Sequence, residues 1–222
     1  WRHSHALHHA TSGDLDRRGL GDVWTLTVKE YRAQPRERRV AYRVYRNPFV
    51  MFGAGPLFSF VVLMRFPFAN KAEKPRERQS VWFTNAALLV TVLTMSLTVG
   101  LGPYLAVQIP VAMVSCGIGV WLFYVQHQYE NVYWARHADW DYFKAALFGS
   151  SFYELPRLLQ WFSGNIGFHH IHHLNPRIPN YNLEQCHRDL PAFRVITPLT
   201  LRGSLKSLRV RLWDEDRGRM VG

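Results

Sequence analysis

Eight of the eleven histidines in this chain fall in two short stretches, residues 3–9 and residues 169–173. Both stretches contain the spacing H-x-x-H-H. On a helix, positions i, i+3 and i+4 share one face, so each stretch can aim three imidazoles at one point. Neutral imidazole is a good ligand for iron, zinc, copper and nickel. The candidate metal ligands are His5, His8, His9, His169, His172 and His173.

The number of these imidazoles indicates more than one metal ion. A zinc ion normally stops at four protein ligands, so six to eight converging histidines favour two metals. The chain has only two cysteines, which disfavours an iron–sulfur cluster, and Cys116 lies inside a long apolar run whereas Cys186 lies far outside it, which disfavours a disulfide. His127 follows a long apolar run and is a further candidate ligand.

The remaining histidines are weaker candidates. His3 lies outside the repeated spacing, and His170 is an ambiguous member of the second cluster. We interpret His137 and His187 as ordinary polar residues, because isolated histidines are usually part of the polar surface.

A run of 48 residues, 79–126, contains no Asp, Glu, Lys, Arg or His. A soluble domain would rarely contain such a run, whereas a membrane-crossing helix needs about 20 apolar residues. The sequence GLGPY at 100–104 is typical of a turn. We therefore predict a transmembrane hairpin over 82–126, with spans near 82–100 and 104–126.

A shorter apolar segment, 48–64, is interrupted by glycines and a proline and has basic residues on both sides, at 36–46 and 71–78. Because Lys and Arg mark the cytoplasmic side, a crossing helix should not have two strongly basic ends. We expect this segment to be interfacial or re-entrant. Residues 1–46 and 127–222 then share the cytoplasmic face and bring the histidine clusters together.

These stretches resemble the membrane fatty acid desaturases of the acyl-lipid omega-6 (delta-12) type. WRHSHALHHATSGDLD resembles the second histidine box of the family, and LQWFSGNIGFHHIHHLNPRIPNYNL resembles the third. YVQHQYENVYW is similar to the stretch between the last span and the third box. The first box, H-x-x-x-H, has no counterpart here, so we expect it and one membrane hairpin to lie upstream of residue 1, and the chain alone to be inactive.

The resemblance implies an all-α integral membrane protein, in which a transmembrane helical hairpin bears a cytoplasmic helical cap with a histidine-rich di-iron site. It treats residues 1–222 as a single desaturase domain. It also implies two iron ions, O₂ as co-substrate, a fatty acyl lipid as substrate, and formation of a cis double bond. The implied iron ligands are His5, His8, His9, His127, His169, His172 and His173.

Several partners and alternatives follow from the same reading. Electrons should come from a separate carrier, such as a ferredoxin or a b-type cytochrome, because no flavin, nicotinamide or haem motif is present. Glycerolipid, coenzyme A and carrier-protein esters all remain open as substrates. A fatty acyl hydroxylase with the same boxes is the nearest alternative, and a non-enzymatic metal-binding membrane protein is a more distant one.

Charge composition adds two expectations. The formal net charge is +11, but the basic residues flank apolar segments, so we predict contact with membrane lipids and no nucleic-acid partner. Metal-ligating histidines usually donate their second ring N–H to a carboxylate or carbonyl. Candidates for that role near the boxes are Asp14, Asp16, Glu130, Asp141 and Asn165.

Overall fold

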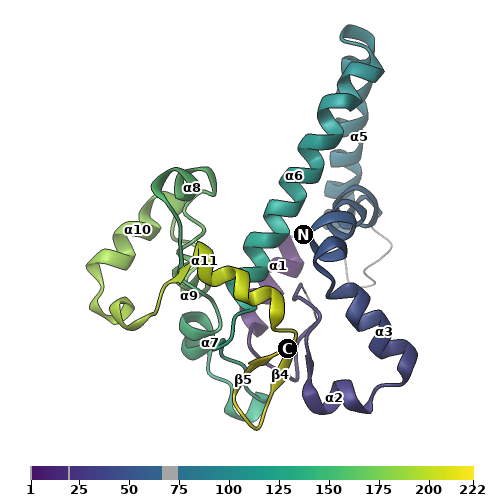
Figure 1. Cartoon of the computed structure of the whole chain (residues 1–222). Helices are drawn as coiled ribbons and strands as arrows, with labels where there is room; N and C mark the ends of the chain where they lie inside the picture. The colour runs from purple at the N-terminus through teal and green to yellow at the C-terminus, as the bar shows by residue number, and fades with distance from the viewer. Residues whose placement is uncertain (1, 20, 67–74) are drawn as a thin grey trace. The chain divides into compact units, whose positions relative to one another are not determined.

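The computed structural model describes residues 2–19, 21–66 and 75–222, and part of the predicted basic stretch at 71–78 lies outside these ranges. The described chain is mostly helical, as predicted (Figure 1). It divides into two compact units, one formed by residues 1–40 and 122–222 and the other by residues 41–121.

The second unit contains most of the apolar sequence. Helix α5 (Pro75–Thr98) and helix α6 (Leu101–His127) are each long and apolar enough to cross a membrane. Only Val99 and Gly100 separate them, and Gly100 has a φ of +94°, which a glycine adopts without strain. No residue of α5 is buried, as expected for a helix that faces lipid.

Helix α5 begins seven residues before the predicted start of the first span at residue 82. Its first turns carry Arg76, Glu77 and Arg78. Nothing in these residues opposes helix formation, and Pro75 is well suited to the first position of a helix. The charged turns therefore extend the helix beyond its apolar part.

The segment 48–64 forms an irregular helix. It passes through a π-helical turn, η1 (Val50–Ala54), a short α4 (Gly55–Leu57), a second π-helical turn, η2 (Phe58–Val62), and η3 (Leu63–Arg65). Helix α3 (Arg36–Tyr45) precedes this segment, and there is a bend of 62° between α3 and Val50–Arg65. The two would make a third membrane span only if they were counted together as one broken helix.

The first unit holds the histidine-rich sequence on short elements. Its helices and 3₁₀ turns, in chain order, are α1 (Arg2–Thr11), α2 (Val28–Ala33), η4 (His137–Asp139), α7 (Tyr142–Phe148), α8 (Arg157–Phe162), α9 (His169–Leu174), α10 (Asn180–Asp189), η5 (Pro191–Val195), α11 (Leu201–Ser204) and η6 (Leu205–Arg209).

Two small sheets tie distant parts of this unit together. Strand β1 (Leu26–Thr27) pairs in parallel with β4 (Leu212–Asp214), which pairs antiparallel with β5 (Arg219–Val221). Strand β2 (Tyr153–Glu154) pairs in parallel with β3 (Leu199–Thr200). The sequence analysis did not predict these sheets, because strands of two or three residues are too short to show an alternating pattern.

Two apolar clusters stabilise the elements that carry the histidines. One includes Trp213 on β4 and Met220 on β5 and also contains Leu15, Val132 and Trp134. The other surrounds α9 and contains Phe168, Ile171, Leu183, Phe193 and Ile196. Ile171 is fully buried in this cluster, so packing on one side of α9 fixes the direction of His169, His172 and His173 on the other side.

Candidate metal centre

Helix α1 carries the first histidine cluster. His5, His8 and His9 recur at i, i+3 and i+4, and His8 and His9 are buried. The helix ends just before Gly13, whose φ is +79° and whose missing side chain leaves room for a backbone carbonyl 3.1 Å from the Cβ position. The chain can therefore turn sharply after α1 and pack closely against the rest of the unit.

Helix α9 carries the second cluster and lasts only six residues. It follows Gly167, where an added Cβ would lie 2.3 Å from the carbonyl oxygen of Tyr153. The Tyr153 backbone N–H donates to the Gly167 carbonyl at 2.7 Å. The hydroxyl of Tyr142, on α7, donates to the carbonyl of His173 at 2.8 Å. Both ends of α9 are thus held by hydrogen bonds from neighbouring elements.

His127 is the last residue of α6 and is 5% exposed. The preceding residue, Gln126, connects the end of α6 to the C-terminal half of the unit by a hydrogen bond from its Nε2 to the Ile166 carbonyl at 2.8 Å. His127 itself donates from Nδ1 to the Gly149 carbonyl at 3.0 Å. This bond fixes both the rotation of the ring and the nitrogen that carries the proton.

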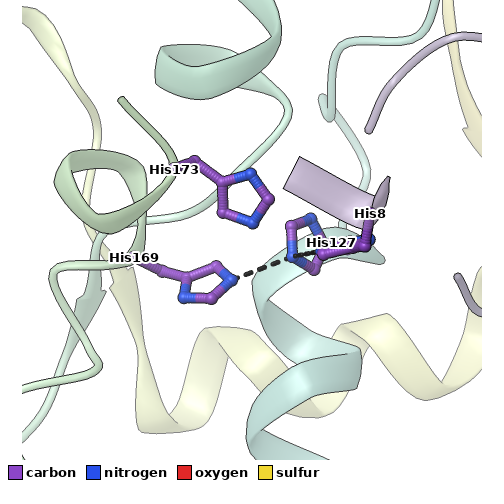
Figure 2. A group of neighbouring side chains, drawn as sticks. All are labelled: His8, His127, His169 and His173. Atoms are coloured by element: carbon purple, nitrogen blue, oxygen red, sulfur yellow. Dashed lines mark hydrogen bonds between the residues drawn. The ribbon is translucent and has the colours of Figure 1, made fainter. Parts of the chain in front are cut away.

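The structure brings all seven predicted ligands into two groups, in each of which the ring nitrogens lie within 4.8 Å of one another. Figure 2 shows the first group, whose rings come from three separate elements and point toward one another. The four-histidine group is His8, His127, His169 and His173, and all four are buried. The three-histidine group is His5, His9 and His172.

The hydrogen bonds of His8 and His127 favour tautomers in which the Nε2 atom of each ring faces the four-histidine group with a lone pair. The Gly149 carbonyl can only accept, so His127 carries its proton on Nδ1 and has a bare lone pair on Nε2. The His8 Nδ1 likewise faces a carboxylate oxygen of Asp22 at 2.5 Å. Nevertheless, the two Nε2 atoms lie 3.2 Å apart. Two lone pairs at that distance repel each other, and a metal ion or a shared proton between them removes the repulsion.

The other nitrogen contacts have similar lengths. His127 Nε2 lies 2.9 Å from His169 Nε2, and His5 Nε2 lies 3.1 Å from His9 Nε2. Ligands about 2.0–2.1 Å from one metal ion are themselves about 3 Å apart. The buried Nε2 of His173 has no hydrogen-bond partner within the described structure. The donor set therefore fits metal ions in both groups.

Burial favours the neutral form of His5, His9, His169, His172 and His173. It is the largest cause of their lowered pKa values, and the neighbouring imidazoles add to it. The pKa of His9 is lowered to about 3 and that of His172 to about 4. The pKa values of His169 and His173 lie well below the ordinary 6.5, and that of His5 is also lowered. At neutral pH these rings offer lone pairs, which is the form that binds a metal.

Asp22 is a functional candidate that the sequence analysis missed. It lies in the loop between α1 and β1, and its Oδ1 accepts from His8 Nδ1 at 2.5 Å. The two side chains are almost fully buried, with 1% of His8 and 6% of Asp22 exposed. The one sequence signal is the GLGD motif, in which glycines allow the chain to return toward α1.

The five residues expected to orient the ligands bond elsewhere. Their partners are, in order, Arg17 and His137 for Asp14; Arg136 for Asp16; Arg219 for Glu130; the Lys144 backbone N–H for Asp141; and the Asn180 carbonyl for Asn165. These contacts tie loops and helix ends together. Closeness to the histidine boxes in the sequence therefore did not identify the carboxylate that bonds a candidate ligand, which is that of Asp22.

The other histidines lie outside both groups. His3 is exposed, and His137 contacts Asp14 from an exposed position. His170 is buried and points away from the metal-ligand face of α9, with its Nε2 3.2 Å from His187 Nδ1. The structure therefore separates His170 from the rest of its cluster.

Comparisons with known proteins agree with this arrangement. Residues 1–197 match the sequence model of the fatty acid desaturase family. A fatty acid desaturase of Bacillus subtilis (strain 168) is 48% identical over 100% of this chain and 62% of its own length. The sn-1 oleoyl-lipid 12-desaturase of Synechocystis sp. (strain ATCC 27184 / PCC 6803 / Kazusa) is 27% identical over 86% of this chain and 53% of its own.

A third relative is the sn-1 acyl-lipid omega-3 desaturase (ferredoxin) of Nostoc sp. (strain 36), which is 28% identical over 82% of this chain and 51% of its own length. The chain thus spans between half and two thirds of the length of these relatives. The family match covers most of the chain and includes both histidine clusters. This chain belongs to the fatty acid desaturase family.

Proposed function

We propose that the protein introduces a cis double bond into a fatty acyl chain and that its seven clustered histidines hold two iron ions. The observation that carries the proposal is the convergence of His5, His8, His9, His127, His169, His172 and His173 into two metal-binding groups within a member of the desaturase family. Iron is chosen over zinc because desaturation requires a redox metal.

The reaction needs an oxidant that side chains cannot provide. The methylene C–H bonds of an acyl chain are not acidic and have no leaving group, and iron, when bound, would supply the oxidising power together with O₂. The chain's own residues would hold the iron through Nε2 of His8 and His127. The Gly149 carbonyl and the Asp22 carboxylate would fix the orientation of those two rings.

The same proposal places the protein in a membrane, with the histidines on the cytoplasmic side. Arginines are concentrated at 36–46 and at the start of α5, which favours a cytoplasmic position for both stretches. Two crossings by α5 and α6 would return the chain to the same side, where α6 ends at His127. Segment 48–64 would remain interfacial or re-entrant.

We propose a membrane acyl lipid as the substrate and a separate protein as the electron donor. The names of two relatives refer to acyl groups on a lipid, and one of these names includes ferredoxin. A ferredoxin or a b-type cytochrome is negatively charged in many cases and would be attracted to the basic surface of this chain by charge complementarity.

A fatty acid profile tests the proposal. The protein would be expressed from its complete open reading frame in a bacterial host together with a ferredoxin and its reductase. Membrane lipids would then be analysed by gas chromatography and mass spectrometry. A matched strain would carry His172→Ala, with His3→Ala as the control because His3 is exposed and outside both groups.

We expect an additional double bond in the host's acyl chains, lost with His172→Ala and kept with His3→Ala. A hydroxylated chain would instead identify the protein as a hydroxylase. Unchanged lipids in the presence of bound iron and a working donor would contradict both enzymatic functions and favour a non-enzymatic metal-binding protein.

A further inference from the structure

We propose that Asp22 is a positioning residue for the metal centre: its carboxylate holds His8 so that Nε2 of the ring faces the four-histidine group. This inference rests on the proposed metal-binding function and extends it to a residue outside the histidine clusters. Asp22 lies 14 residues after His8, and its Oδ1 is 2.5 Å from His8 Nδ1.

The two oxygens of Asp22 have different partners. Oδ1 accepts from His8, while Oδ2 accepts from the backbone N–H of Gly19 at 3.3 Å. The second bond anchors the carboxylate to its own loop. The first then controls the rotation of the imidazole, because rotating the ring would break the bond inside a nearly dry site.

The loop is shaped to deliver Asp22 to this position. Gly21 has a φ of +81°, and a Cβ at that residue would lie 2.9 Å from the Ser4 carbonyl oxygen and 3.3 Å from His8 Cβ. The loop backbone therefore lies directly against α1 at the level of His8. A side chain at Gly21 would push the loop away and separate Asp22 from the imidazole.

The hydrogen bond has two consequences for metal binding. It places the proton of His8 on Nδ1, which leaves the Nε2 lone pair free, and the negative carboxylate makes that lone pair more basic. In the structure, His8 Nε2 lies 3.2 Å from His127 Nε2, whose proton is likewise held on Nδ1 by the Gly149 carbonyl. Asp22 and the Gly149 carbonyl thus orient two adjacent ligands.

Cobalt(II) binding tests the proposal without reference to activity. The chain would be purified in detergent without metal and titrated with Co²⁺, and its visible d–d spectrum and dissociation constants would be recorded. The variants are Asp22→Ala and Asp22→Asn. Asp16→Asn is the matched control, because Asp16 belongs to the same loop but pairs with Arg136 and is 43% exposed. His8→Ala provides the reference for a lost ligand.

We expect Asp22→Ala to weaken Co²⁺ binding by about 10–100-fold and to change the d–d spectrum. Asp22→Asn should fall between Asp22→Ala and the unmodified protein, because an amide oxygen can accept the bond but carries no charge. Asp16→Asn should match the unmodified protein. Thermal unfolding of each metal-free variant, followed by circular dichroism, would show that the folded structure is retained.

The proposal would be overturned if Asp22→Ala had the same Co²⁺ affinity and the same d–d spectrum as the unmodified protein. If Asp22→Ala does not fold, the nearly isosteric Asp22→Asn provides the same test. Failure of both variants to fold without metal would assign Asp22 a purely structural role and would also overturn it. Full Co²⁺ binding by His8→Ala would also overturn it, because His8 would then not be a ligand. Absence of Co²⁺ binding by the unmodified protein would contradict the metal-binding function itself, so the two failures can be told apart.

Discussion

His9 and His173 stack their rings with centroids 4.1 Å apart and 16° between the planes, although 164 residues separate them in the chain. His9 belongs to the three-histidine group and His173 to the four-histidine group. The stacked pair is therefore the junction between the two candidate metal positions. Because each group has its own ligands, the two positions can be tested separately.

Replacing one histidine in either group should remove the metal of that group and leave the metal of the other. His169→Ala takes a ligand from the four-histidine group, and His5→Ala takes one from the three-histidine group. We expect each variant to retain about half of the metal of the unmodified protein, measured by inductively coupled plasma mass spectrometry after saturation with Co²⁺. His3→Ala is the control, and full occupancy in either ligand variant would rule out these two groups as independent sites.

Stability of the metal-free protein should fall as the pH drops below about 6.5. The pKa of His9 is lowered to about 3 and that of His172 to about 4, while the unfolded chain protonates its histidines near 6.5. Between those values the unfolded state binds more protons, so acid favours unfolding. The effect should level off near the folded pKa values.

Thermal unfolding of the metal-free protein, measured between about pH 7.5 and pH 4.5, checks this expectation. His172→Gln should make the pH dependence shallower, since one of the shifted groups is removed. A melting temperature that does not change with pH over this range would mean that these imidazoles are not kept neutral by burial.

Gly167→Ala should disturb the start of α9. The new Cβ would lie 2.3 Å from the Tyr153 carbonyl oxygen, and that oxygen belongs to strand β2, which cannot move freely. We expect a loss of about 1–3 kcal/mol in the free energy of unfolding, as for other overpacked sites. Chemical denaturation measures it. Gly119→Ala is the control because its Cβ would meet no atom within 4 Å, and equal stability of both variants would contradict the close approach.

Asp14→Ala should reduce stability without weakening metal binding by the folded protein. Asp14 is fully buried and accepts from Arg17 at 2.6 Å and His137 at 2.7 Å, and neither partner belongs to a histidine group. Loss of these bonds should cost about 1–3 kcal/mol. Chemical denaturation and Co²⁺ titration of the same preparation test both halves. A large loss of Co²⁺ affinity with little change in stability would place Asp14 in the metal centre.

The predictable part of the site is the part encoded by local spacing. His5, His8 and His9 lie on one helix, as do His169, His172 and His173, and the helical period alone places each set on one face. The apolar run likewise predicts α5 and α6, because membrane-crossing length depends on composition over many residues.

Long-range contacts could not be predicted in the same way. Asp22 reaches His8 through a loop whose path depends on Gly21, and no periodic pattern describes that path. The Gly149 carbonyl that orients His127 is a backbone atom and leaves no signature in side-chain type. The pairing of Leu26 with Leu212 joins strands too short to be recognised. In each case the determining interaction lies between residues distant in the chain.

The central claim is that seven histidines from three parts of the chain hold two iron ions. The most direct measurement is the iron content per chain of protein that has been reconstituted with iron in the absence of oxygen. ⁵⁷Fe Mössbauer spectra would be recorded on the same samples. The comparison is a variant that carries both His8→Ala and His172→Ala. The account predicts two high-spin ferrous ions per chain in the unmodified protein and none in the double variant. Equal iron in both, or no iron in either under conditions where both remain folded, would contradict it.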